Sequence, residues 1–296
     1  MANKINTDIG IEVIPVADIE GFRAAISDLL KERAPLEVGF RGQEQASWEL
    51  KPSLFRYLEN ISYDKSRVSF KTAVSVLEDK YREALIGNSD ISQDIIREMD
   101  IWHLGQHYGL ATPQLDWSYS PWVALYFSME RPTKEDQDLS AVWVLDIGVL
   151  NILNASIRSE VWPEHGGMVI GGDFVENFPT MDIQIVNDEN NRRLLSQQGF
   201  FTKHYHFHTF EVWLYKAIEN LGWDMNKTVG PLKKITIPRS AINRKKILRE
   251  LQLMNIAPRT LFPDIWGSSK EAMYQMEQHI TASHGRVFSI ARKQNK

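Results

Sequence analysis

The residues best suited to chemistry lie in one segment, residues 106–127, where polar side chains stand among aromatic ones. It contains His107, Tyr108, Asp116 and Ser118, with turn-forming glycine and proline nearby. Polar groups in such surroundings are costly to bury unless each finds a hydrogen-bonding partner. The segment is therefore predicted to form a wall of a site. For His107 and Tyr108, contact with a ring or ribose and a role as satisfied core residues are equally good interpretations.

A second candidate group is Arg41, at the end of an alternating segment that predicts a strand over residues 36–42. Arginine is always charged, and its planar fork of donors suits a phosphate or a carboxylate. Gly42 beside it would let a ligand approach the backbone. A structural ion pair at the end of the strand explains Arg41 equally well, so both interpretations stay open.

Asp116 also has a structural explanation. It lies four residues before Ser120, which precedes a proline and is a typical helix start. A carboxylate near a helix N-terminus is favoured by the unpaired backbone N–H groups and by the helix dipole. On this interpretation Asp116 holds a turn and Ser118 acts as a cap.

Hydrophobic periodicity predicts the elements that position these residues. Helices are predicted near residues 19–30, 74–85, 91–102, 122–127, 243–253 and 271–280, and strands near 36–42, 141–147 and 234–238, with one or two more within 200–215. Asp18 and Ser120 are predicted N-caps, and Gly109 is predicted to end the third helix. The glycine pairs at 166–167 and 171–172 indicate a hairpin or a mobile loop. No linker is evident, so we predict a single large α+β domain, a mixed sheet with helices packed around it.

Composition restricts the class of protein. The chain has 296 residues, a net charge of −4 and no cysteine, which excludes disulfides, thiolate metal sites and a cysteine nucleophile. No apolar run approaches the roughly 20 residues that cross a membrane. The N-terminus lacks the basic-then-apolar pattern of a signal peptide. We therefore expect a cytoplasmic protein without membrane contact.

A basic stretch lies between residues 233 and 249. Its members are Lys233, Lys234, Arg239, Arg244, Lys245, Lys246 and Arg249. A solvated helix face is the simpler interpretation. A face that binds phosphate or nucleic acid is the alternative.

Three histidines alternate along the chain at His204, His206 and His208, with Glu211 close by. On a strand the three would face the same side, and such a pattern can bind zinc. Because histidines on strand surfaces are common and no further ligand is assured, we predict no metal site here.

Four motifs follow one another along the chain, each occurring once. They are Phe40-Arg41-Gly42, the segment from Gln106 to Phe127, the segment from Arg193 to Phe201, and the segment from Thr260 to Gly267. Together they resemble the FRG domain family, named after the first triplet, over roughly Val38 to Met276. The resemblance implies an N-terminal helical segment at 1–34, an FRG domain at 35–280 and a basic C-terminal tail at 281–296. The family usually has a basic residue at Gln114, so this departure weakens any phosphate-binding role there.

The arrangement is also similar, as a distant analogy, to ADP-ribosyltransferases. Those enzymes grip the NAD phosphates with an Arg-Gly at the end of an early strand, which here corresponds to Arg41-Gly42. They follow it with a Ser-rich turn into an apolar helix, here residues 118–127. Their third part is a glutamate that binds the ribose and stabilises an oxocarbenium-like centre. This chain has Gln197 there, which can hydrogen-bond a ribose but lacks the charge, so Asp116 or Glu211 would supply it.

These implications predict one polar cleft that binds NAD or a related nucleotide, with ADP-ribosyl transfer or N-glycosidic cleavage as the reaction. The predicted catalytic residues are Asp116 and Gln197, and the predicted ligand-binding residues are Arg41, Gln43, His107, Tyr108, Thr112 and Ser118. NAD would be a substrate; no bound cofactor or metal is predicted. Two alternatives stay open. One is a non-catalytic binding or sensor module, for example in phage defence. The other is a nucleic-acid-binding protein that uses the basic stretch.

The last motif is predicted to be structural. Phe262 is apolar enough to anchor in the core, and the proline after it fixes a turn. Asp264 would then cap a helix in the region from Trp266 to Met276 and so clasp the C-terminal helix onto the body of the domain.

Overall fold

The computed structural model describes residues 11–31, 34, 36–87, 96, 101–132, 138–161, 169–170, 173–174, 179–185, 191–223 and 230–294. The strands of its main sheet are β1 (Glu12–Pro15), β2 (Val38–Gln43), β3 (Gln114–Ser118), β4 (Leu139–Asp146), β7 (Asp182–Gln184), β8 (Gly199–Lys203) and β9 (Leu232–Pro238). A separate hairpin joins β5 (Val169–Ile170) and β6 (Asp173–Phe174). The glycine pairs predicted to flank it lie outside the described residues.

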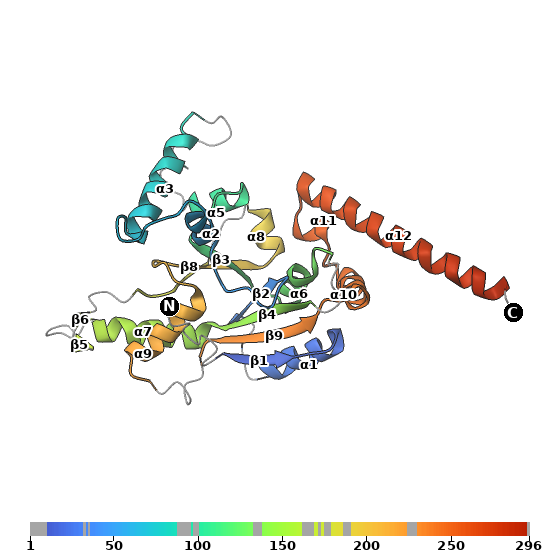
Figure 1. Ribbon diagram of the computed structural model, residues 1–296, viewed down its shortest axis with the longest axis horizontal. Helices are drawn as coiled ribbons and strands as arrows, with labels where there is room; N and C mark the ends of the chain where they lie inside the picture. The colour runs from blue at the N-terminus through green and yellow to red at the C-terminus, as the bar shows by residue number, and fades with distance from the viewer. Residues whose placement is uncertain are drawn as a thin grey trace.

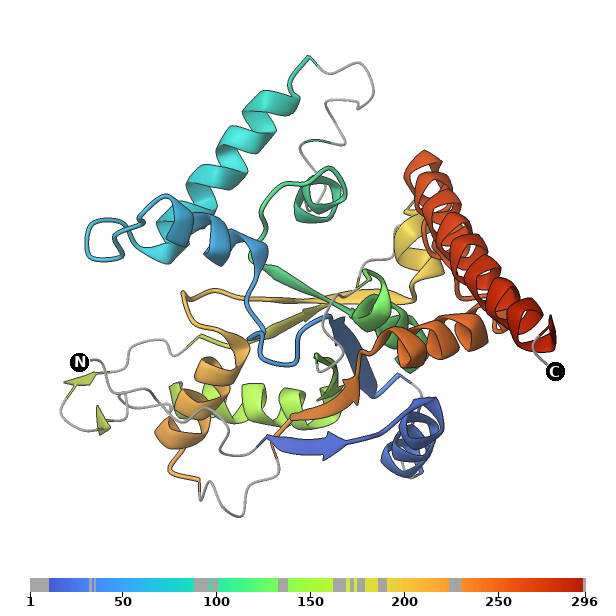
Figure 2. The same ribbon diagram turned by 45° about the vertical axis from the view of Figure 1, so that its right-hand side comes forward.

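Helices fill both faces and both ends of this sheet. They are α1 (Ile19–Leu30), α2 (Ser53–Asn60), α3 (Phe70–Leu85), α5 (Ile101–His107), α6 (Pro121–Met129), α7 (Ile147–Val161), α8 (Arg192–Ser196), α9 (Phe210–Asn220), α10 (Ala241–Leu253), α11 (Pro258–Leu261) and α12 (Ile265–Gln294). Figures 1 and 2 show α3 and α12 extending beyond the sheet.

The sheet is mixed and open, with strand order β1-β9-β4-β2-β3-β8-β7. β1 runs parallel to β9, and the other described pairs are antiparallel. The pairing between the described strands β2 and β3 is short, with one residue pair, Phe40 opposite Ser118. The prediction of one α+β domain with a mixed sheet and surrounding helices is confirmed.

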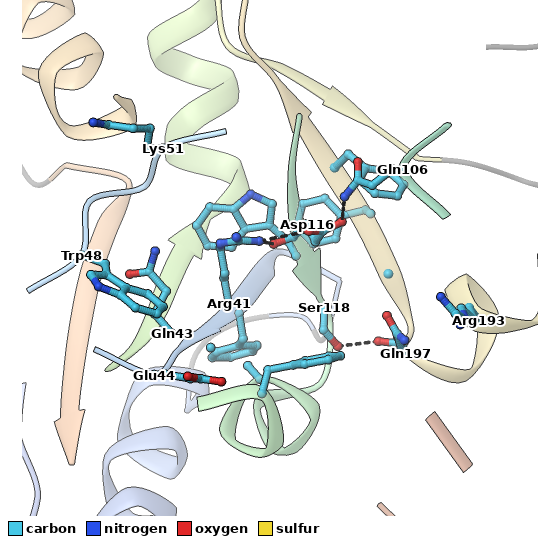
Figure 3. A pocket seen from close by; sticks show the side chains of 18 of the residues that line it. Arg41, Gln43, Glu44, Trp48, Lys51, Gln106, Asp116, Ser118, Arg193 and Gln197 are labelled. Atoms are coloured by element: carbon cyan, nitrogen blue, oxygen red, sulfur yellow. Dashed lines mark hydrogen bonds and ion pairs between the residues drawn. The ribbon is translucent and has the colours of Figure 1, made fainter. Parts of the chain in front are cut away.

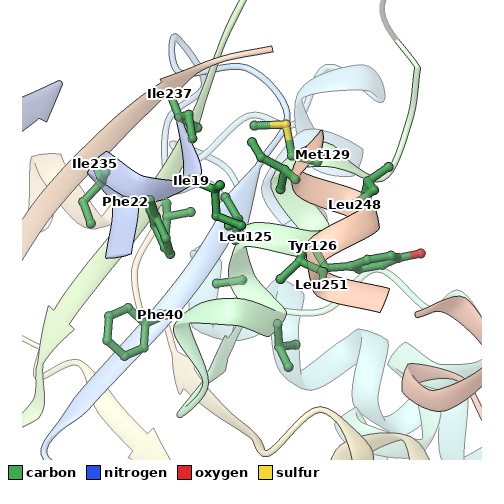
Figure 4. Packing of buried hydrophobic residues seen from close by; sticks show 14 of the residues in the cluster. Ile19, Phe22, Phe40, Leu125, Tyr126, Met129, Ile235, Ile237, Leu248 and Leu251 are labelled. Carbon is green, nitrogen blue, oxygen red and sulfur yellow. The ribbon is translucent and has the colours of Figure 1, made fainter. Parts of the chain in front are cut away.

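Two apolar clusters hold helices on the two faces of the sheet. On one face α1, α6 and α10 pack on alternate residues of β2, β4 and β9, including Phe40 and Ile235 (Figure 4). On the other face α7 and α9 cover Trp143 and Phe200, together with Trp117. A smaller cluster joins α2 to α3. β4 is buried without interruption from Ser140 to Leu145, as expected for a strand covered on both faces, and its side chains alternate between the two clusters.

The predicted helix signals act as expected at three positions. The side chains of Asp18 and Ser120 accept backbone N–H groups at the starts of α1 and α6. Gly109 has a φ of +90°, and the N–H of Leu110 donates to the carbonyl of Gly105, which ends α5 with a Schellman turn. Most of the helix predicted at 91–102 lies outside the described residues, as do the first ten residues.

Two predicted boundaries are wrong. Residues 200–215 form a strand only as far as Lys203, and a helix capped by Thr209 follows, because Phe210, Trp213 and Ala217 also recur at helical spacing. The last helix begins at Ile265 rather than near 271, and it continues through residue 294. Most of the predicted tail at 281–296 is therefore helical.

Candidate functional site

A pocket of about 1120 Å³ opens where β2 meets β3. Five of the predicted site residues line it: Arg41, Gln43, Asp116, Ser118 and Gln197. They come from β2, β3 and the turn after α8, so segments far apart in the sequence share one site (Figure 3). Arg41, Asp116 and Gln197, which come from the first three motifs, therefore line one pocket, as predicted for these residues.

Arg41 lies directly after the single registered pair between β2 and β3. Its Nη1 donates to the main-chain oxygen of Asp116 at 2.8 Å and lies 3.3 Å from the carboxylate Oδ2. Its Nε is buried and has no hydrogen-bonding partner in the described part of the chain. One guanidinium therefore forms the ion pair with Asp116 through Nη1 and still carries a donor, Nε, that no described residue uses.

Asp116 is held from two sides, although its side chain is 57% exposed. Gln106 donates its amide N–H to Oδ1 of Asp116, and the Gln106 oxygen accepts from the hydroxyl of buried Thr112 at 2.9 Å. The residue lies inside β3, so the interpretation of Asp116 as a carboxylate at a helix N-terminus is wrong. Ser120 fills that position. Sequence reasoning missed Gln106 as a site residue, although it opens the second motif.

Gly42 is required by packing. A Cβ at this position would stand 1.9 Å from the carbonyl oxygen of Ala124 and 2.7 Å from the backbone nitrogen of Ser128, both in α6. The glycine therefore lets a helix approach the strand, which corrects its interpretation as an opening for a ligand. Gln43 is also bound within the fold, since it accepts from Trp143 Nε1 at 2.7 Å and donates to the carbonyl of Glu49.

Ser118 ties the turn after α8 to the start of α6. Its hydroxyl donates to the carbonyl of Gln197 at 2.6 Å and accepts the N–H of Ser120. Gln198 follows with a φ of +49°, and its carbonyl accepts the N–H of Tyr119. The Gln197 side chain donates to the carbonyl of Leu261. These bonds fix the wall of the pocket on which Gln197 stands.

Residues 37–137 match the family model of the FRG domain. The chain contains an FRG domain. The matched residues hold the first two motifs, whereas the third and last motifs lie beyond them. No curated protein and no solved structure matches the chain. The analogy with ADP-ribosyltransferases therefore has no support from these comparisons.

Basic side chains from inside and outside the matched residues line the pocket. Lys51 and Arg56 lie on or just before α2, and Arg193 lies on α8. Partial burial and, to a smaller extent, the charge of Arg41 lower the pKa of the Arg56 guanidinium. Burial lowers and contact with Glu59 raises the pKa of the Lys51 ammonium, with a net rise. No sequence signal marked Lys51 or Arg56 as part of the site, whereas Arg193 opens the third motif.

Two other predicted site residues, Tyr108 and Thr112, do not line the pocket. Tyr108 is 74% exposed, and Thr112 is fully buried and acts through Gln106. The backbone of His107 ends α5, and its side chain lies outside the described residues. Glu211 is buried away from the pocket, where both carboxylate oxygens accept the N–H of Leu50. Burial raises the pKa of Glu211.

The histidines do not share a strand face, because β8 ends at Lys203. His204 is buried, and His206 stacks on Trp213 with ring centroids 6.3 Å apart. Within the described residues no cluster of histidine, aspartate and glutamate side chains is arranged to hold a metal ion. The Nε2 atom of His208 lies 3.1 Å from the Nζ atom of Lys216.

The basic stretch is largely paired with carboxylates. The pairs are Lys233 with Glu12, Arg239 with Glu44, Arg244 with Glu277 and Lys246 with Glu20. Arg239 and Arg244 are buried as well. The stretch therefore does not form a continuous solvated basic face. None of the described helices is long and apolar enough to cross a membrane.

Proposed function

We propose that the pocket of the FRG domain binds a nucleotide, with NAD as the leading candidate, and that Arg41 holds its phosphates. The observation that carries the proposal is the buried Nε of Arg41, which lacks a partner among the described residues. A buried donor without an acceptor destabilises the protein by roughly 1–3 kcal/mol. A phosphate oxygen at this edge would remove that penalty, and the fork of a guanidinium matches phosphate geometry.

The surroundings of Arg41 favour an anion larger than a single phosphate. Arg56 lines the same pocket and adds a second guanidinium, so an anion bound there would offset the repulsion between the two positive charges. Trp48, which is half exposed, lines the pocket and offers a ring face to a base or a nicotinamide. A volume of about 1120 Å³ is sufficient for a dinucleotide.

The reaction we propose is cleavage of the N-glycosidic bond of NAD, with transfer of the ADP-ribosyl group to water or to another acceptor. As the bond between nicotinamide and ribose breaks, positive charge develops on the ribose. Asp116 is a carboxylate beside Arg41 that could stabilise this charge, and Gln106 holds its orientation. Gln197 would accept a ribose hydroxyl through its amide oxygen, since its amide N–H is already bound to Leu261.

Calorimetric titration tests the binding step. Wild type should bind NAD, ADP-ribose and ADP, and adenosine should bind at least about tenfold more weakly, because it lacks the phosphates. Arg41→Gln should weaken ADP binding by about tenfold or more, and Arg41→Lys should recover part of the affinity. Arg23→Gln is the control, because Arg23 pairs with Glu250 on the outer face of α1 and α10. Equal ADP affinity in Arg41→Gln and wild type would overturn the role of Arg41.

Release of nicotinamide from NAD tests the chemical step separately. Asp116→Asn should abolish release and leave NAD affinity within about threefold of wild type, because the carboxylate acts on the developing charge. Binding of NAD without release by the wild type would favour the alternative of a non-catalytic binding or sensor module. That outcome would leave the phosphate site of Arg41 in place.

A further inference from the structure

Arg193 stands on a different wall of the pocket from Arg41. It belongs to α8, whereas Arg41 belongs to β2, and both line the same cavity. In Figure 3, Arg193 and Gln197 lie to one side of Arg41, and Trp48 and Lys51 lie to the other. The pocket therefore presents cationic groups at two separate places.

The Arg193 guanidinium is fixed in position by its neighbours. Its Nε donates to Asp264 Oδ2 at 2.8 Å. Its central carbon lies 5.3 Å from the ring centre of Phe262 and 5.1 Å from that of Trp266. Cation–π contacts of this kind hold the plane of an arginine without occupying its donors. The side chain remains 22% exposed.

The terminal amino groups of Arg193 make no hydrogen bond to another described residue, because Nε alone binds Asp264. One edge of the guanidinium is thus anchored, and the opposite edge carries free donors beside the cavity. A preorganised fork of donors loses little side-chain freedom when it binds an anion, so it is well suited to a phosphate. The contact with Asp264 holds α8 against the start of α12, and the amino groups of Arg193 that it does not use stay available to a ligand in the pocket.

We propose that Arg193 forms a second anion subsite, and that the ligand of this pocket is a nucleotide with phosphates at two separate positions, as in NADP. The inference rests on the proposed nucleotide site at Arg41. The pyrophosphate of the dinucleotide lies at Arg41, and the 2′-phosphate of the adenosine ribose lies at Arg193. The nicotinamide end then lies toward Trp48.

The experiment compares two probes that differ by one phosphate. Calorimetric titration of the full chain with NAD and NADP should show that NADP binds about tenfold or more tightly. Arg193→Gln should reduce NADP affinity to the level of NAD and leave NAD affinity within about twofold. Arg23→Gln is the matched control and should leave both affinities unchanged. Adenosine 2′,5′-bisphosphate against AMP repeats the comparison without the nicotinamide half.

The outcomes separate this inference from the proposed function. Equal binding of NAD and NADP by the wild type would overturn the second subsite and leave the nucleotide site at Arg41 standing. Equal loss of both ligands in Arg193→Gln, with a lowered melting temperature, would assign Arg193 a structural role alone. Binding of neither dinucleotide would refute the proposed function, and the inference with it. The wild-type comparison needs no substitution, so equal binding of the two dinucleotides overturns the second subsite even where Arg193→Gln fails to fold.

Discussion

Replacement of Gly42 by alanine tests the central packing contact of the fold. A Cβ at Gly42 would stand 1.9 Å from the oxygen of Ala124 and 2.7 Å from the nitrogen of Ser128. Both atoms belong to the backbone of α6, so no side-chain rotation relieves the overlap. Overpacking of a core typically lowers the free energy of unfolding by about 1–3 kcal/mol. A clash with a backbone oxygen should cost at least the upper value, because the backbone cannot move aside.

We therefore expect Gly42→Ala to lower the free energy of unfolding by about 3 kcal/mol or more. In urea unfolding, with a slope of about 3 kcal/mol per molar, the midpoint should fall by roughly 1 M. Gly148→Ala is the matched control, since a Cβ there would meet only Asp146 Oδ1 at 3.4 Å and should change stability by no more than about 0.5 kcal/mol. A midpoint for Gly42→Ala that equals that of wild type would refute the close contact between α6 and β2.

Three further predictions concern stability. Phe262→Ala should destabilise by about 3–5 kcal/mol in urea unfolding, because the ring is 7% exposed; a change below about 1 kcal/mol would contradict its burial. Asp116→Asn should change unfolding free energy by less than about 1 kcal/mol, since its carboxylate is 57% exposed and exposed ion pairs contribute little; a larger loss would make Asp116 a structural residue. Burial lowers the pKa of His204 to about 3, from 6.5, so the imidazole stays neutral in the folded state while the unfolded chain takes up a proton. The neutral His204 imidazole leaves the free energy of unfolding unaffected above pH 6.5. As the pH falls from 6.5 toward 3, that free energy decreases by about 1.4 kcal/mol per pH unit. His204→Asn should flatten the pH dependence of urea unfolding between pH 4 and 6 by that slope, and an unchanged slope would indicate that His204 is not buried.

Local signals in the sequence predicted much of the fold. Asp18 and Ser120 cap helices through their own side chains, and Gly109 ends a helix through its positive φ. Asp264 caps α12 by accepting the N–H of Gly267, and Phe262 is buried, as predicted for the last motif. Such signals act within a few residues of the chain, so they can be read without knowledge of the fold.

The composition of the site was harder to predict, because it depends on contacts between distant segments. Arg56 and Gln106 enter the pocket because α2 is bonded to Thr112 and α5 to Asp116, and no local pattern encodes these contacts. The role of Gly42 likewise depends on α6, which lies about eighty residues further along the chain. In residues 200–215 the aromatic side chains fit both a strand and a helix, and tertiary packing decides between them.

The pairing of β1 with β9 has a consequence for the order of events during synthesis. Glu12 lies beside Lys233 in the parallel register, and the two side chains form an ion pair across 221 positions of the chain. At roughly 5–20 residues per second, β1 leaves the ribosome on the order of 10–40 s before its partner strand is made. During this interval its hydrogen-bonding edge has no place in the sheet. β1 can therefore take its place at the edge of the sheet only after β9, its partner strand, has been synthesised.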